Sequence, residues 1–192
     1  MPAKRRSTAD LERTHCSCDL CTAGCYTMPG ALVSGDLEKI AEACGQEEVT
    51  LSWLLSHFWA SEGAKVIKTA VVDGDTKHLA IRVPTIVPQQ TADGRCVFLS
   101  ADNKCSIHEV SPFGCAYHDM HMDKEEAYRR SEIAVRDQLV SHRDNDDYAR
   151  YCLLLSQLRR EAPPLDSRRA AFDTEIRRIE QEQQDVDRST AG

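Results

Sequence analysis

The sequence lacks any run of about 18 apolar residues, the length that a membrane-spanning helix requires. Residues 1–8 are basic and polar, with no apolar segment behind them, so a secretory signal is not expected. We therefore expect a cytoplasmic protein without a membrane partner. Stable disulfides are rare in that compartment, and an odd count of nine cysteines fits a fully paired disulfide framework badly.

A basic surface is also missing. The net charge is −7, and the one dense basic run, Lys4 to Arg6, lies at the terminus. A nucleic-acid partner is therefore not expected. No nucleotide-binding glycine loop, Ser–His–Asp signature or HExxH motif occurs. Acidic residues such as Asp123 and Glu126 are explained as the first turn of a helix, so the sequence leaves open whether the protein is an enzyme.

Cysteine, by contrast, is concentrated. Seven of the nine cysteines fall into two clusters, within residues 15–25 and 94–115. Thiolates that recur every few residues in small turns converge on one soft cation or on an iron–sulfur cluster. The clusters therefore predict metal binding. Their thiols belong to Cys16, Cys18, Cys21, Cys25, Cys96, Cys105 and Cys115.

The number of thiols leaves two arrangements open. Tetrahedral zinc takes four ligands, fewer than the six or seven thiolates available. Either one site takes four of them while the others surround it or form a redox pair, or two sites exist, such as an iron–sulfur cluster plus a single ion. The C-x2-C-x3-C run from Cys18 to Cys25 is more typical of a cluster-binding loop than of a zinc ribbon. Its spacing does not exclude zinc.

The second cluster carries a specific signature, G-x-C-x-F-L followed by C-x-I-H and P-x-x-C, over residues 94–115. Together with the first cluster it resembles the YkgJ-type cysteine-cluster family, a zinc- or iron-chelating domain, over roughly residues 16–120. Many members carry an adjacent Cys-Cys pair where three residues here separate Cys21 from Cys25. Flagellin lysine methylases carry a similar cluster. The resemblance implies this ligand set, with Cys16 as a candidate seventh: Cys18, Cys21, Cys25, Cys96, Cys105 and Cys115.

The remaining candidate residues have competing interpretations. Cys44 and Cys152 follow apolar helical periodicity, which predicts buried, structural thiols. His118 and His121 lie just behind Cys115 and either bind metal, donate to a thiolate, or are solvated. The role of His15, next to Cys16, is equally open.

The pattern predicts an α+β, mainly helical fold: a cysteine-cluster metal domain with a small β-hairpin region, followed by a C-terminal helical extension. We expect the metal domain over residues 15–122 and the extension over residues 123–192. A hairpin is predicted around Asp73-Gly74, with regular pairing ending at Pro84 and Pro88, and a short strand over 95–99. Helices are expected over 36–44, 50–60, 123–142, 145–161 and 165–187.

Three functions compete. The leading hypothesis is an iron–sulfur protein, with a [4Fe–4S] cluster, that acts in electron transfer or as a redox accessory subunit. The second is a structural zinc module that supports a protein-interaction helix. The third is a cluster-dependent enzyme similar to the flagellin lysine methylases. A narrow apolar seam along residues 165–187 indicates either a helix packed on the domain or a surface for a protein partner.

Overall fold

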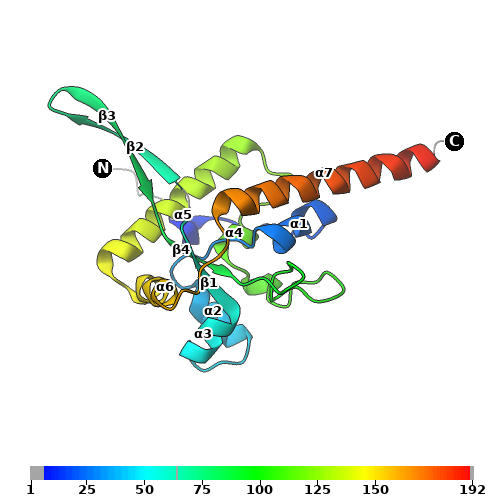
Figure 1. Ribbon diagram of the computed structural model, residues 1–192, viewed down its shortest axis with the longest axis horizontal. Coiled ribbons are helices and arrows are strands. Elements are labelled where there is room, and N and C mark those ends of the chain that lie inside the picture. Colours follow the sequence, from blue (N-terminus) through cyan, green and yellow to red (C-terminus); the bar gives the residue numbers. More distant parts are fainter. Residues whose placement is uncertain (1–6, 64, 191–192) are drawn as a thin grey trace.

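The computed structural model of the protein describes residues 7–63 and 65–190. It confirms an α+β, mainly helical fold (Figure 1). The elements, in chain order, are η1 (Thr8–Asp10), α1 (Asp19–Thr27), α2 (Asp36–Ala43), α3 (Leu51–His57), β1 (Phe58–Ser61), β2 (Lys65–Val72), β3 (Asp75–Arg82), β4 (Thr85–Pro88), η2 (His108–Val110), α4 (Phe113–Ala116), α5 (Lys124–Asp144), α6 (Asp147–Gln157) and α7 (Leu165–Thr190).

The hydrophobic core draws on both halves of the chain. Leu37 of α2, Leu54 of α3 and Leu155 of α6 are all buried in it. The buried hydroxyl of Tyr148, in α6, donates to the Leu32 carbonyl at 2.9 Å and accepts from the Ile86 amide at 3.2 Å. These bonds hold α6 against β4 and against the segment that follows the first cysteine cluster. The division at residues 122 and 123 remains a prediction.

The segment after α2 departs from its predicted structure. The helix expected over 50–60 ends at His57, and the next four residues form β1, paired antiparallel with β4. The expectation that Pro84 and Pro88 end regular pairing holds for the hairpin, since β3 ends at Arg82, and pairing stops again at Pro88. It missed the short strand β4 between the two prolines. Pro88 is the last residue of β4 and pairs with Phe58. A proline at the end of a two-stranded sheet removes little from the ladder, so the pairing tolerates it.

The predicted hairpin is confirmed as β2 and β3, which project from the rest of the molecule (Figure 1). Asp73 and Gly74 both have positive φ, 55° and 86°, as a tight two-residue turn requires. The strand expected over 95–99 does not form. That stretch is a turn-rich loop with two isolated bridges, Gln90 to Cys96 and Leu99 to Cys105.

The three C-terminal helices lie close to their predicted positions, and α7 packs against α1. Ile179 is buried and Phe172 half-buried, so the interpretation of α7 as a helix packed on the domain holds as far as Ile179. Val186, the last residue of the predicted seam, is 60% exposed. No helix within residues 7–63 and 65–190 combines the length and apolar character needed to cross a membrane.

The two cysteines outside the clusters have different fates. Cys152 is buried in α6, as predicted. Cys44 is exposed, so its predicted burial was wrong. The physical reason is that α2 ends at Ala43, so that Cys44 is its C-cap residue outside the helix, and Gly45, with φ at 73°, then turns the chain away. Helical periodicity located the helix correctly but overran its last turn.

Candidate metal centre

The N-terminal segment is fixed to the second half of the chain before it reaches the first cysteine. The Thr14 amide donates to the Ala116 carbonyl at 2.6 Å. The Arg13 guanidinium donates to the carbonyl of His108 at 2.7 Å and to the Ser111 hydroxyl at 3.1 Å. These bonds involve no candidate ligand. They place Cys16 beside the loop that joins α4 to α5.

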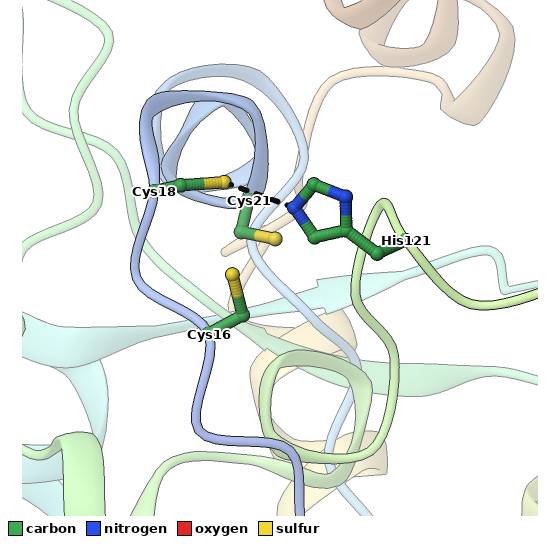
Figure 2. A group of neighbouring side chains, drawn as sticks. All are labelled: Cys16, Cys18, Cys21 and His121. Atoms are coloured by element: carbon green, nitrogen blue, oxygen red, sulfur yellow. Dashed lines mark hydrogen bonds between the residues drawn. The ribbon is translucent and has the colours of Figure 1, made fainter.

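The first group of donors, here called the outer group, consists of Cys16, Cys18, Cys21 and His121. Their sulfur and nitrogen atoms all lie within 4.8 Å of one another. Figure 2 shows the three thiols and the imidazole ring converging, with a hydrogen bond of 3.2 Å between the Cys18 sulfur and His121 Nε2. Cys18 and His121 are exposed, whereas Cys16 and Cys21 are half-buried.

Local backbone structure explains the electrostatics of the outer group. Cys18 is the N-cap residue of α1, where backbone N–H groups are free to bond an acceptor. The Cys21 backbone N–H, followed by the His121 side chain, lowers the pKa of Cys18 to about 6. The Cys18 sulfur in turn raises the pKa of His121, and burial raises the pKa of Cys21 to about 12. Without metal, therefore, Cys18 is far more readily ionised to a thiolate than Cys21.

The second group, here called the inner group, consists of Cys25, Cys96, Cys105 and Cys115. Cys96 belongs to the hydrophobic core, and Cys25 and Cys105 pack against it. The Cys96 amide donates to the Cys25 carbonyl at 2.6 Å, which ties the loop after β4 to the last turn of α1. The antiparallel bridge between Leu99 and Cys105 then brings the chain back toward Cys96.

The four inner thiols interact electrostatically with one another. Burial is the largest cause of a raised pKa at each of them: to about 11 for Cys25, to about 12 for Cys96, and well above the ordinary value for Cys115. The charge of Cys105 adds to the shift of the other three. Four neighbouring thiols whose surroundings keep them protonated need a cation to hold them as thiolates.

Two glycines allow Cys115 to approach the other inner thiols. A side chain on Gly30 would overlap the backbone of Gly114, and a side chain on Gly114 would overlap that of Gly30 and Ala31. Because neither residue has a side chain, the two segments lie close together. The Gly114 amide donates to the Ala31 carbonyl at 2.8 Å, and the Gly30 amide donates to the Cys115 sulfur at 3.2 Å. The Pro-Gly turn after the first cluster therefore supplies an N–H group to a thiol of the second.

A buried carboxylate fixes the same contact from the other side. Asp36, at the first turn of α2, accepts hydrogen bonds from the amides of Val33 at 3.0 Å and Phe113 at 2.9 Å. Phe113 begins α4, the short helix that carries Cys115. Burial raises the pKa of Asp36, and the two amide bonds act against that shift. Asp36 thus holds α4 at a set position relative to the turn that contains Gly30.

The structure therefore places the predicted ligands in two groups. Cys21 and Cys25 lie in a helix, α1, rather than in a loop, and Cys18 is the N-cap residue of that helix. Cys21 and Cys25 lie one helical turn apart on α1, and the structure places them in different groups. The predicted ligand set is divided accordingly, with Cys16, Cys18 and Cys21 in the outer group and the other four thiols in the inner group.

Among the histidines left open by the sequence, His121 is the one that joins a group. His15 is exposed and outside both groups. His118 contacts the Ala127 carbonyl and the Ser131 hydroxyl and packs edge-on against Phe113, a structural role. In the sequence, the signal for His121 was its position six residues after Cys115. His118 also lies close behind Cys115, so this signal did not separate the two histidines.

Both donor sets suit soft or borderline metals. Three thiolates and an imidazole, or four thiolates, are ligand sets of tetrahedral zinc, and four thiolates also hold iron–sulfur clusters. Two such sets on a small α+β scaffold define a metal-chelating cysteine-cluster domain. Residues 17–153 match the family model CxxCxxCC, described as "Putative zinc- or iron-chelating domain". The match covers more than half of the chain, which therefore belongs to this family. No curated protein and no solved structure matches the chain.

Proposed function

We propose that the inner group holds an iron–sulfur cluster of the [4Fe–4S] type, and that the protein acts in electron transfer or as a redox accessory subunit. The observation that carries this proposal is the convergence of four sheltered thiols from three separate segments: α1, the loop after β4, and α4. Four cysteine thiolates are the ligand set of such a cluster. When bound, the cluster would supply one-electron transfer.

The spacing of the inner thiols supports a cluster over a single ion. Among the described residues, the outer group is the one set of three or more such donors with all ligand atoms within 4.8 Å. No three of the inner thiols therefore have all their sulfur atoms within 4.8 Å of one another. A cubane core places iron and sulfide between its thiolates, whereas zinc draws four sulfurs around one point at about 2.3 Å each. The wider set suits the larger core.

The surroundings of the inner group also suit redox chemistry. Hydrogen bonds to the sulfurs, burial and solvent exposure set the potential of an iron–sulfur cluster. The Gly30 amide supplies one such bond to Cys115, and the core contacts of Cys96 limit water. These residues would hold the cluster in one geometry and tune its potential.

The decisive measurement is the iron and acid-labile sulfide content of protein purified without air, together with its visible spectrum. We expect about four irons and four sulfides per chain, with a broad visible band that oxygen bleaches. Cys96→Ser and Cys115→Ser should each abolish the band. Cys44→Ser, which removes an exposed thiol outside both groups, should leave it intact.

A colourless, air-stable protein with zinc in the inner group would overturn the cluster and favour the structural zinc module. The metal would then contribute folding free energy and no redox chemistry. The family description, zinc- or iron-chelating, is the observation that keeps this second candidate. A protein partner bound through the C-terminal helical segment stays a prediction in either case.

A further inference from the structure

We propose that the outer group is a second, separate metal site that binds a single zinc ion, with His121 as its fourth ligand. This inference goes beyond the proposed function, because it holds whether the inner group binds a cluster or an ion. The outer group differs from the inner group in ligand chemistry, exposure and spacing. Each difference favours one zinc ion over an iron–sulfur cluster.

The geometry of the outer group leaves room for one ion. Zinc binds thiolate sulfur at about 2.3 Å and imidazole nitrogen at about 2.0–2.1 Å, so tetrahedral ligand atoms lie roughly 3.5–3.8 Å apart. All four outer donor atoms lie within 4.8 Å of one another, and the sulfur of Cys18 is already 3.2 Å from Nε2 of His121. Small movements would complete the tetrahedron. A four-iron core would require the donors to separate.

The elements that carry these ligands are held together by bonds that do not involve the ligand atoms. Arg130, on α5, donates from one guanidinium nitrogen to the Glu12 carbonyl at 2.8 Å and to the Tyr117 carbonyl at 3.0 Å. The Asp119 carboxylate accepts from the His121 amide at 2.9 Å. Arg130 thus joins the segment before Cys16 to the loop that carries His121. A site prepared in this way loses little conformational entropy when it binds an ion.

One further contact supports a ligand role for this loop. The Met120 amide lies 3.5 Å from the Cys21 sulfur, in position to donate to it, as backbone amides do beside metal thiolates. The loop therefore contributes an imidazole to the site and an N–H group to another ligand. Cys18 and His121 are exposed, so the ion would sit at the surface and exchange with the solution.

The test is to count metals by site in the intact protein. The wild type, purified anaerobically, should contain about one zinc in addition to the metal of the inner group. Cys18→Ser and His121→Ala should each lose this zinc, with an affinity loss greater than the roughly 10–100-fold that removal of an outer-shell partner costs. His15→Ala and Cys44→Ser change an exposed histidine and an exposed cysteine outside the group, and both should keep the zinc.

Cobalt gives a readout that misfolding cannot imitate. Cobalt(II) added to zinc-depleted wild type should give a tetrahedral visible spectrum with sulfur charge-transfer bands. His121→Cys should restore a tetrahedral site, with stronger charge transfer because a fourth thiolate replaces the imidazole. Cobalt spectra that are identical in wild type and His121→Cys would show that residue 121 is not a ligand, and would overturn the proposal.

The paired variant Cys96→Ser, Cys115→Ser separates this proposal from the proposed function. It should lose the inner metal and keep one zinc that depends on His121. If the paired variant loses that zinc as well, while its helical content is unchanged, the two groups form one site and the proposal fails. If the wild type contains zinc in the inner group and no iron, the cluster proposal fails and the outer site stands.

Discussion

At the scale of single residues, a pair of glycines controls whether the inner group can assemble. Gly30 and Gly114 approach so closely that a β-carbon on either overlaps the backbone of the other segment. Neither glycine has a positive φ, so glycine is required at these positions because a side chain would not fit, and not because of the backbone conformation. The contact aligns the Gly30 amide with the Cys115 sulfur. A methyl group at this point would act on folding and on metal binding together.

Gly30→Ala should destabilise the protein by more than about 3 kcal/mol, since the clash is with backbone that cannot rotate away. Urea unfolding at neutral pH measures the change in free energy of unfolding. Gly24→Ala is the matched control, because Gly24 lies within α1 and a β-carbon there meets nothing within 4 Å. Removing a helical glycine should stabilise by up to about 1 kcal/mol. Equal effects of the two substitutions would contradict this account.

The thiols differ in reactivity as well as in position. In reduced, metal-free protein, alkylation of Cys18 should reach half its maximal rate near pH 6, because its thiolate is stabilised by the Cys21 amide and by His121. The rate should fall below that pH, where Cys18 takes up a proton. Cys44 is exposed, but partial desolvation raises its pKa, so it should react slowly until the pH exceeds the ordinary thiol value of about 8.5. Mass spectrometry of labelled peptides resolves the two sites.

The substitution His121→Ala tests whether the imidazole stabilises the Cys18 thiolate. It removes the second-largest influence on the Cys18 thiolate, so the midpoint of Cys18 alkylation should move to higher pH while that of Cys44 stays constant. A Cys18 midpoint unchanged by His121→Ala would show that the imidazole does not stabilise the thiolate in solution.

At the scale of elements, α7 packs against α1 and supports it, and α1 is the helix that carries ligands of both groups. Ile179 is buried where the two helices meet, and a partly open cleft beside it is lined by residues of both, including Ala23 and Glu182. Beyond Glu180 every described residue of α7 is exposed. The helix therefore contributes to stability mainly through the residues up to Ile179.

Ile179→Ala should lower the free energy of unfolding by about 2 kcal/mol, the low end for a buried aliphatic residue, because one side of its site is a single helix. Val186→Ala, at an exposed position of the same helix, should change it by less than about 0.5 kcal/mol. Hydrogen exchange of the α1 amides reports the coupling directly. It should accelerate in Ile179→Ala and not in Val186→Ala.

Elements with local causes could be predicted from the sequence, and those with distant causes could not. The Asp73-Gly74 turn fixed the β2–β3 hairpin, and Gly45 fixed the end of α2 to within a residue. β4 could not be predicted, because its pairing depends on β1, some 25 residues away. Likewise, the clustered cysteines could be recognised from the sequence as candidate metal ligands. Their division into two groups depends on α1 being helical and on where the loop after β4 returns.

At the scale of the whole molecule, the metals would close long loops of chain. The outer group joins Cys16 to His121, and the inner group joins Cys25 to Cys115. Bound metal therefore links the N-terminal segment to α4 and to the loop before α5. Metal binding that requires the folded arrangement stabilises that arrangement by mass action.

Removal of metal by a strong chelator under reducing conditions should therefore lower the urea midpoint at neutral pH. The loss should be about 4 kcal/mol for a metal present at a thousand times its dissociation constant. Adding zinc back should restore the part of this loss that comes from the outer group. Apo and metal-loaded protein with the same midpoint would mean that metal does not bind the folded chain in preference to the unfolded chain, and would contradict this account.

The order of the ligands along the chain also has a consequence for biosynthesis. Cys25 precedes Cys115 by 90 residues, and the three outer thiols precede their histidine by at least 100. At about 5–20 residues per second, the ribosome needs roughly 5–20 s to supply the missing ligands. During that interval Cys16, Cys18, Cys21 and Cys25 stand together on the nascent chain, four thiols open to any soft cation. If both groups bind metal, the choice of metal would then depend on the timing of delivery as well as on the geometry of the two groups.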